Sequence, residues 1–236
     1  MAYTTIDNPG LFFNTVLYTG NGSTQSITGV GFQPDWVWIK NRTEDYEHTI
    51  FDSVRGVQKF IRSSTTGAEA TNSNSLTAFG TDGFSIGTES AVNDNSDSFV
   101  SWNWLASGST ASNSNGSITS TVSANTTAGF SIVSYTGTGS AATVGHGLGA
   151  APEIVIVKRR NNADGWQVYV DGLSSVNHYL RLDTTAAEAS DSSRFGAAPT
   201  ASVFSVGTAN GTNASGDTYI AYCFAGKQGY SKFGKY

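Results

Sequence analysis

The chain has 236 residues, enough for one large domain or two of ordinary size, and either can bury a core without disulfides or metals. Charged residues make up 13% of the chain and aromatic residues 12%, a composition too rich in aromatic side chains for a disordered protein. The net charge of −5 provides no basic footprint for nucleic acid, so nucleic acid is not an expected partner.

The first ten residues contain neither the basic region nor the apolar region of a signal peptide, and no apolar run reaches the roughly 18 residues of a membrane helix. We therefore expect no membrane insertion. The single cysteine, Cys223, has no partner for an internal disulfide. It lies in the apolar run 219–224, which predicts a buried strand residue.

In chain order, the clearest predicted elements are short strands separated by turns. Residues 36–40, 83–87 and 98–104 are rich in β-branched and aromatic side chains or alternate apolar with polar ones. Residues 154–158 have the same character in the second half. Turn sequences with Gly, Asn and Asp separate these segments, at residues 20–22, 81–83, 163–165 and 210–211.

The two halves of the chain are related by an internal repeat. The box Tyr-Thr-Gly-Asn-Gly-Ser at 18–23 returns as Tyr-Thr-Gly-Thr-Gly-Ser at 135–140, and later segments match in the same order. We interpret this as a tandem duplication. Its recurring residues, predicted to have structural roles, are Tyr18, Gly20, Pro34, Lys40 and Asp97 in the first copy and Tyr135, Gly137, Pro152, Lys158 and Asp217 in the second.

The repeat predicts an all-β protein with two tandem antiparallel β-sandwich domains of jelly-roll-like type. The first repeat covers 1–106 and the second covers 129–236. Residues 107–128 are rich in Ser, Thr, Asn and Gly and are interpreted as a linker or an extended surface segment. The last residues resemble the start of a repeat, so the chain is expected to end at the start signal of a missing third repeat.

Catalytic residues are not predicted. His48, His146 and His178 have no counterparts in the other copy, and no nucleophile elbow of the Gly-x-Ser-x-Gly type is present. The densest acidic stretch is Glu44, Asp45, Glu47 and Asp52, which we interpret as a solvated loop with local ion pairs in preference to a pair of glycosidase carboxylates.

No metal or cofactor is predicted either. Residues 93–97, Asn-Asp-Asn-Ser-Asp, alternate oxygen-bearing side chains as calcium loops do. The equivalent residues 213–217 lose part of this pattern, and no glutamate follows at the twelfth position. A structural turn is the favoured interpretation, because Asn and Asp side chains also bond their own backbone.

The five tryptophans are candidates for a sugar-stacking surface. Trp36 and Trp38 share one strand face, as do Trp102 and Trp104, and the second copy has other large apolar residues at these positions. We therefore assign these four to the core. Trp166 lies in a Gly/Asp loop, and with Tyr169 it is the predicted contact for a glycan or receptor.

Several motifs resemble a known family, the tail-fibre-like virion proteins of marine bacteriophages, including phages of cyanobacteria. Residues 1–9, 18–23 and 34–42 resemble the start of such proteins. The resemblance covers nearly the whole chain and continues through residues 51–56, 100–104, 144–149, 179–185 and 229–234. It supplies no catalytic residues, and longer relatives run on into a further repeat.

The resemblance implies a non-enzymatic virion protein, made in the host bacterial cytoplasm and exposed on the particle as a tail fibre or appendage. Its expected partners are other virion proteins, further copies of itself as a homo-oligomer such as a trimer, and a glycan or protein of the host surface. Two alternatives stay open. One is a capsid decoration protein or head fibre, and the other is a carbohydrate-binding module with or without glycan hydrolysis.

Overall fold

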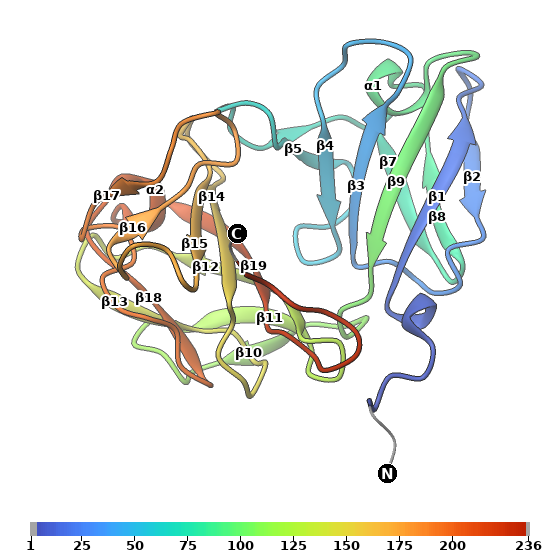
Figure 1. Cartoon of the computed structure of the whole chain (residues 1–236). Coiled ribbons are helices and arrows are strands. Elements are labelled where there is room, and N and C mark those ends of the chain that lie inside the picture. Colours follow the sequence, from blue (N-terminus) through green and yellow to red (C-terminus); the bar gives the residue numbers. More distant parts are fainter. Residues whose placement is uncertain (1–3, 235–236) are drawn as a thin grey trace. The chain divides into compact units, whose positions relative to one another are not determined.

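The computed structural model describes residues 4–234, which divide into two compact units (Figure 1). The N-terminal unit comprises Asn8–Thr65 and Glu69–Ser109. The C-terminal unit begins at Thr110, and residues 4–7 and 66–68 belong with it. The regular secondary structure of each unit is almost entirely β, with antiparallel pairing between its strands, so the predicted all-β class is confirmed.

The elements of the N-terminal unit are η1 (Pro9–Leu11), β1 (Phe13–Thr19), β2 (Gln25–Thr28), β3 (Trp36–Asn41), β4 (Thr49–Asp52), β5 (Lys59–Arg62), β6 (Ala70–Thr71), β7 (Leu76–Gly80), β8 (Gly83–Ile86), α1 (Ser90–Asn93) and β9 (Ser98–Trp104). One sheet has the order β1-β9-β3-β4-β5-β6 and the other β2-β8-β7. Their facing side chains form one core, in which Val37 of β3 joins Ile27 of β2 and Phe84 of β8.

The elements of the C-terminal unit are β10 (Ala111–Asn113), β11 (Ser120–Asn125), β12 (Phe130–Thr136), β13 (Ala142–Gly145), β14 (Ile154–Arg159), β15 (Gln167–Val170), β16 (His178–Tyr179), β17 (Ala189–Ser190), β18 (Val203–Val206), α2 (Asn210–Asn213) and β19 (Thr218–Phe224). The large sheet has the order β10-β11-β12-β19-β14-β15, and β13 pairs with β18. Cys223 is buried in β19, as predicted.

The two units share a strand order that matches the sequence repeat. The run β1-β9-β3-β4 of the first sheet corresponds to β12-β19-β14-β15 of the second, and the smaller pair β2-β8 corresponds to β13-β18. In the N-terminal unit, β3 to β6 follow one another as a meander within one sheet. The N-terminal unit therefore resembles a jelly roll in having two facing sheets, but the connections between its strands are different.

Residues 107–128 are not a linker, contrary to the sequence-based expectation. They contain β10 and β11, and β11 pairs antiparallel with β12 from Thr121↔Ser134 to Asn125↔Phe130. The two larger apolar residues of this segment, Ile118 and Val122, are 6% and 7% exposed and belong to the core of the C-terminal unit. Backbone pairing, which needs no apolar side chains, explains why so polar a sequence forms strands.

The Tyr-Thr-Gly box is held by a buried asparagine in both units, an arrangement that we call the asparagine clasp. In the C-terminal unit the Asn213 amide donates to the carbonyl oxygens of Ser140 (2.6 Å) and Gly207 (2.7 Å), and the Thr138 N–H donates to its Oδ1 (2.8 Å). The Tyr135 hydroxyl donates to Thr212 O at 2.6 Å.

Asn93 makes the equivalent bonds in the N-terminal unit, to the carbonyl oxygens of Ser23 and Gly87, and the Asn21 N–H donates to its Oδ1. The box requires glycine for close approach. A Cβ on Gly20 would lie 2.0 Å from Asp94 O, and one on Gly137 would lie 2.3 Å from Ala214 O. The motif that defines the repeat is therefore structural.

The other recurring polar residues also hold strand ends. The Lys40 ammonium donates to Tyr46 O at 2.9 Å. The Lys158 ammonium donates to Asp164 O at 2.7 Å, and in both units the acceptor lies six residues after the lysine. Asp97 accepts from the Asn41 amide at 2.7 Å. Asp217 accepts from Asn161 at 2.7 Å and pairs with Arg159, and these bonds, led by that from Asn161, lower the pKa of its carboxyl.

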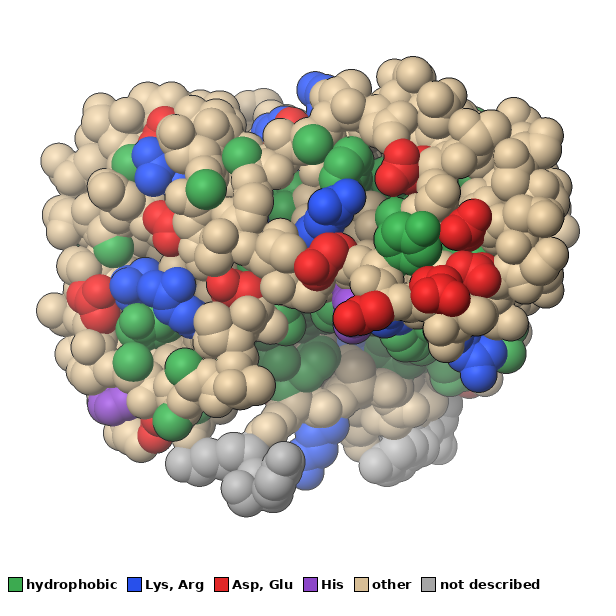
Figure 2. All heavy atoms as spheres, turned by 90° about the horizontal axis from the view of Figure 1, so that it is seen from above, with side chains coloured by type: hydrophobic (Ala, Val, Ile, Leu, Met, Phe, Trp, Pro, Cys, Tyr) green, Lys and Arg blue, Asp and Glu red, His purple; other side chains and the backbone are tan. Residues whose placement is uncertain are grey.

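The surface is mainly uncharged, in agreement with the composition. Figure 2 shows one face, on which tan side chains and backbone predominate and charged side chains are scattered. Leu11, Leu17 and Val57 are the large hydrophobic residues that remain exposed among the described residues. Leu17, in strand β1, has the highest exposure of the three at 63%.

Candidate functional site

The predicted glycan contact is wrong, because Trp166 and Tyr169 are buried. Trp166 is 0% exposed and stacks on Tyr222 of β19, with ring centroids 6.4 Å apart. Tyr169 is 4% exposed, lies in β15 and packs in the core against Phe195. Neither ring reaches a ligand from solvent.

The four other tryptophans lie on the face of the N-terminal sheet that points away from Val37 and Ile39. Neighbouring rings contact one another across β3 and β9, with centroids 4.4 Å apart for Trp36 and Trp104 and 6.0 Å apart for Trp38 and Trp102. Trp36 is 1% exposed, and the others are half-buried. The assignment of all four to the core is therefore wrong for Trp38, Trp102 and Trp104, which pack against one another on the face opposite the core cluster.

The histidines have separate environments. The buried His146 ring accepts from the Leu148 N–H at Nδ1 (3.2 Å) and lies 3.1 Å from Thr200 O at Nε2. Nε2 therefore carries the proton, and burial lowers the pKa of this imidazole. His178 contacts Ser175 through Nδ1 at 2.8 Å, and burial also lowers the pKa of His48.

The acidic stretch of the N-terminal unit does not gather its carboxylates into one site. Glu44 and Asp45 are exposed. Asp52 is completely buried and pairs with Arg55, whose Nε lies 2.5 Å from Asp52 Oδ2. Arg55 also donates to Ile50 O at 3.0 Å, which fixes the turn after β4.

The predicted turn at 93–97 has structural contacts throughout. Asn93 forms the asparagine clasp, Asp94 accepts from the Tyr46 hydroxyl at 3.2 Å, and Asp97 accepts from Asn41. Within residues 4–234, no group of three or more His, Cys, Asp or Glu side chains is placed to hold a metal ion.

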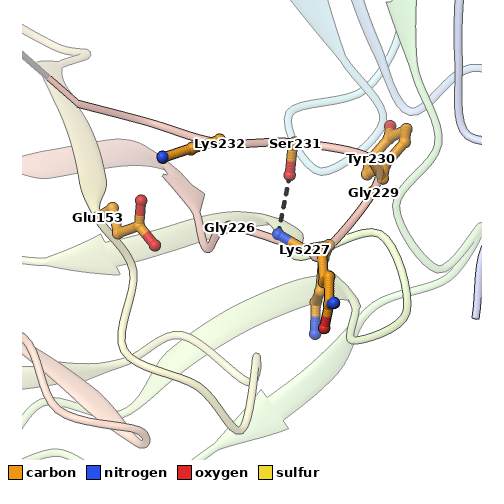
Figure 3. A pocket seen from close by; sticks show the side chains of 8 residues that line it. Glu153, Gly226, Lys227, Gly229, Tyr230, Ser231 and Lys232 are labelled. Carbon is orange, nitrogen blue, oxygen red and sulfur yellow. Dashed lines mark hydrogen bonds between the residues drawn. The ribbon is translucent and has the colours of Figure 1, made fainter. Parts of the chain in front are cut away.

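A pocket of about 450 Å³ lies where the chain turns after β19, and we call it the C-terminal pocket. The turn is closed by bonds from the Lys227 N–H to Ser231 O (2.9 Å) and from the Tyr230 N–H to Lys227 O (3.0 Å). Figure 3 shows the Glu153 carboxylate and Lys232 at one end of this view and Tyr230 at the other. The lining residues are Glu153, Gly226, Lys227, Gln228, Gly229, Tyr230, Ser231 and Lys232.

Glu153 shows how the pocket arises, because its counterpart in the N-terminal unit is the buried Asp35. The Asp35 carboxylate accepts from Ser53 Oγ (2.7 Å), the Ala106 N–H (2.8 Å) and the Gly108 N–H (3.0 Å). Within residues 4–234, the Glu153 carboxylate has no hydrogen-bond partner, and a Cβ on Gly226 would lie 2.7 Å from its Oε1. The Glu153 side chain thus lies in an open pocket, whereas the shorter Asp35 side chain at the equivalent position is hydrogen-bonded within its own unit.

The groups in the C-terminal pocket suit a polyhydroxylated ligand. A carboxylate without a protein partner accepts hydrogen bonds from hydroxyl groups, lysine ammonium groups donate them, and a tyrosine ring offers a face for stacking. Partial burial raises the pKa of the Tyr230 hydroxyl, which keeps it protonated as a donor. The arrangement is suited to binding.

A second pocket of about 420 Å³ lies beside β13 and β18 in the same unit. Its lining contains no charged residue; it combines apolar side chains such as that of Phe195 with hydroxyl groups, which come from Ser117, Thr143, Ser192 and Ser205. It has fewer groups than the C-terminal pocket to fix the orientation of a ligand.

Sequence reasoning missed the C-terminal pocket. Its signal was the replacement of Asp35 by Glu153 at a repeat position, together with Tyr230, Lys227 and Lys232 in a glycine-containing tail. Glu153 and the tail are far apart in the chain, and only the pairing of β14 with β19 brings them together.

The fold defines this chain as an all-β protein with antiparallel sheets, and the same asparagine clasp occurs in both of its units. A model of a domain of unknown function, DUF7483, matches residues 8–236, which span both units. The chain belongs to the DUF7483 family. No curated protein and no solved structure matches it. No helix in the described part of the chain has the length and apolar character needed to cross a membrane.

Proposed function

We propose that this protein is a non-enzymatic structural component of a bacteriophage particle, namely a tail fibre or tail appendage. The observation that carries the proposal is that the residues found in both copies of the repeat make structural contacts. The box tyrosines, glycines and asparagines, the lysines at 40 and 158, and the aspartates at 97 and 217 all hold strands and turns together. A duplication that preserves scaffold contacts favours a building block of an assembly.

The resemblance of the motifs to tail-fibre-like proteins of marine phages supports the same role. The uncharged polar surface suits a protein that repeats many times on a particle, because it avoids repulsion between like charges. Partners would be other virion proteins and further copies of this chain.

Cryo-electron microscopy of the purified virus, with antibodies to this chain as markers, tests the location. Labelled density around the tail is the expected result. Labelled density on the capsid lattice would instead assign the chain as a decoration protein or head fibre. Particles that lack the chain altogether would refute the virion role.

We further propose that the C-terminal pocket contributes to host adhesion by binding a surface glycan. The observation that favours this is the Glu153 carboxylate, which has no hydrogen-bond partner within residues 4–234, while its counterpart Asp35 is fully bonded. A glycan hydroxyl would complete its hydrogen bonding.

A glycan array made from bacterial surface polysaccharides measures this binding. Glu153→Gln is expected to weaken retention about tenfold or more, because a hydrogen bond to a charged group contributes roughly 1.5–3 kcal/mol. Asp171→Asn, which removes the same charge at an exposed position outside the pocket, serves as the control. If the two variants are retained equally well, or if the protein binds no glycan on the array, the proposed glycan binding at this pocket is wrong.

A further inference from the structure

The outer edge of β1 is open, whereas the equivalent edge in the C-terminal unit is covered. β1 ends the order β1-β9-β3-β4-β5-β6, so β9 is its only neighbour among the strands of residues 4–234. Its counterpart β12 lies between β19 and β11. Among the strands of residues 4–234, β12 therefore has a covering strand and β1 has none.

The hydrogen bonds between β1 and β9 show which backbone N–H and C=O groups of β1 have no partner in β9. Gly20 donates its N–H to Asp97 O in continuation of the pairing with β9, so Tyr18, Val16 and Asn14 bond to β9 at alternate positions. The backbone groups of Phe13, Thr15, Leu17 and Thr19 therefore point to the open side. Two of them are capped locally, since Asn14 Oδ1 accepts from the Thr15 N–H and Gln25 donates to Thr19 O.

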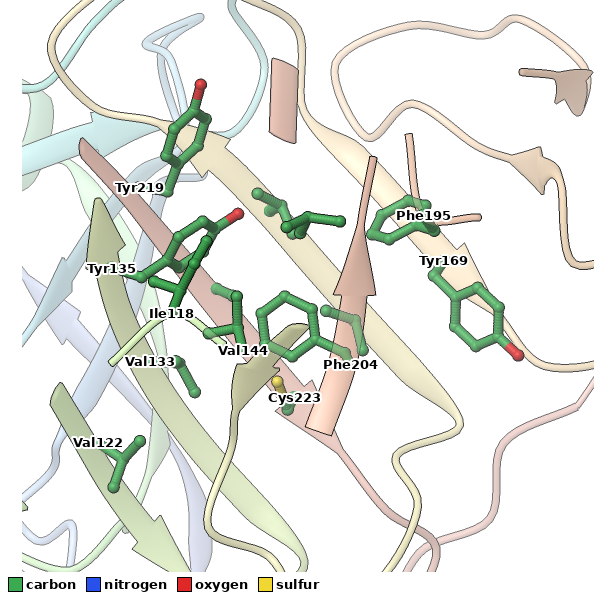
Figure 4. Close-up of a cluster of buried hydrophobic side chains, with 14 of the residues drawn as sticks. Ile118, Val122, Val133, Tyr135, Val144, Tyr169, Phe195, Phe204, Tyr219 and Cys223 are labelled. Carbon is green, nitrogen blue, oxygen red and sulfur yellow. The ribbon is translucent and has the colours of Figure 1, made fainter. Parts of the chain in front are cut away.

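The side chains of this edge are less buried than the equivalent side chains of the second unit. Val133 and Tyr135 of β12 are 0% and 4% exposed, while the equivalent Val16 and Tyr18 of β1 are only partly buried. Figure 4 shows Ile118 and Val122, from the covering segment, in the same cluster as Val133 and Tyr135. Within residues 4–234, the core cluster of the N-terminal unit is formed by residues that lie in α1 or in strands from β1 to β9.

β1 also lacks the features that normally protect an edge strand. Its sequence Phe-Asn-Thr-Val-Leu-Tyr-Thr has seven residues, no charge, no proline and a regular register with β9. Leu17, in its middle, is 63% exposed. Natural sheets place lysines, prolines or bulges at edges that must remain unpaired, and none of these is present here.

We propose that the outer edge of β1 is a docking site for an uncharged β-strand supplied by another protein chain, which pairs antiparallel with β1 as β11 pairs with β12. The partner is an extended segment of about six residues with small apolar side chains at alternate positions, as Val122 and Ala124 are placed in β11. Backbone bonds supply affinity, and contacts with Leu17 and Tyr18 supply register.

A synthetic peptide with the sequence of residues 117–126 is the probe. Added to the full chain, it is expected to slow hydrogen exchange at the Phe13 and Leu17 amides about tenfold when its concentration is ten times the Kd. The Val16 and Tyr18 amides, already bonded to β9, should change little. Residue-resolved NMR exchange distinguishes this alternation from general stabilisation.

Leu17→Lys is expected to abolish the protection, because a charge at the edge opposes strand pairing while the bonds to β9 stay intact. Leu11→Lys adds the same charge at a residue that is 51% exposed in η1 outside the strand, and it should leave the protection unchanged. Circular dichroism of both variants verifies that the fold is retained.

Two outcomes would overturn the proposal. If the alternate protection appears without peptide and grows with protein concentration, the edge pairs with β1 of a second copy instead of a β11-like strand. If neither peptide nor concentration protects these amides, the edge is not a docking site.

Discussion

Asn213→Ala is expected to lower the free energy of unfolding by about 3 kcal/mol, because it leaves buried polar groups unpaired. Asn213 is completely buried, and its amide satisfies two carbonyl oxygens, those of Ser140 and Gly207. Its Oδ1 also accepts the Thr138 N–H. Alanine restores none of these bonds, and each unsatisfied group costs roughly 1–3 kcal/mol before relaxation. Urea unfolding followed by tryptophan fluorescence measures the difference.

Asn210→Ala is the matched control. Asn210 begins the same short helix but is exposed, so its loss should change stability by less than about 0.5 kcal/mol. A similar small effect for both variants would show that the asparagine clasp is not a stabilising unit. Asn93→Ala tests the equivalent clasp of the other unit and should match Asn213→Ala.

The free energy of unfolding is expected to rise by about 2 kcal/mol as the pH increases from 8 to 10.5, because of Lys158. Burial is the main cause that lowers the pKa of this ammonium from 10.5 to about 8. In that interval the unfolded chain keeps the proton while the folded chain has released it, so a rise in pH favours the folded state. Solvent around the amine reduces the effect below that of the full pKa shift.

The measurement compares urea unfolding of the wild type and Lys158→Met at several pH values. The difference between them isolates Lys158, since tyrosines and Cys223 titrate in both proteins. If the free energy of unfolding changes with pH in the same way for the wild type and Lys158→Met, the predicted contribution of Lys158 is wrong.

Much of the fold was predictable because the chain contains an internal comparison. Residues that recur in both copies, such as Tyr18 and Tyr135, were predicted to be structural, and both hydroxyls bond the backbone of the short helix. Alternation predicted the strands near 36–40, 98–104 and 154–158, which are present as β3, β9 and β14. Local periodicity is enough for such elements because it reports which faces are apolar.

The candidate site was not predictable in the same way. Trp166 follows a glycine and was expected to be exposed, yet it is covered by stacking on Tyr222 from a distant strand. The polar segment 107–128 looked unstructured because its strands are held by backbone bonds to β12. In both cases the deciding neighbour lies elsewhere in the chain.

By itself, the sequence determined the all-β class and predicted an internal repeat with structural roles for its most specific motifs. Periodicity and repetition are properties of the chain and can be read along it. Only the tertiary structure decided that β11 covers the edge of β12, that the edge of β1 is open, and that Glu153 lies in a pocket. Strand pairing and burial depend on which distant segments meet, and backbone hydrogen bonds between polar residues leave little trace in composition.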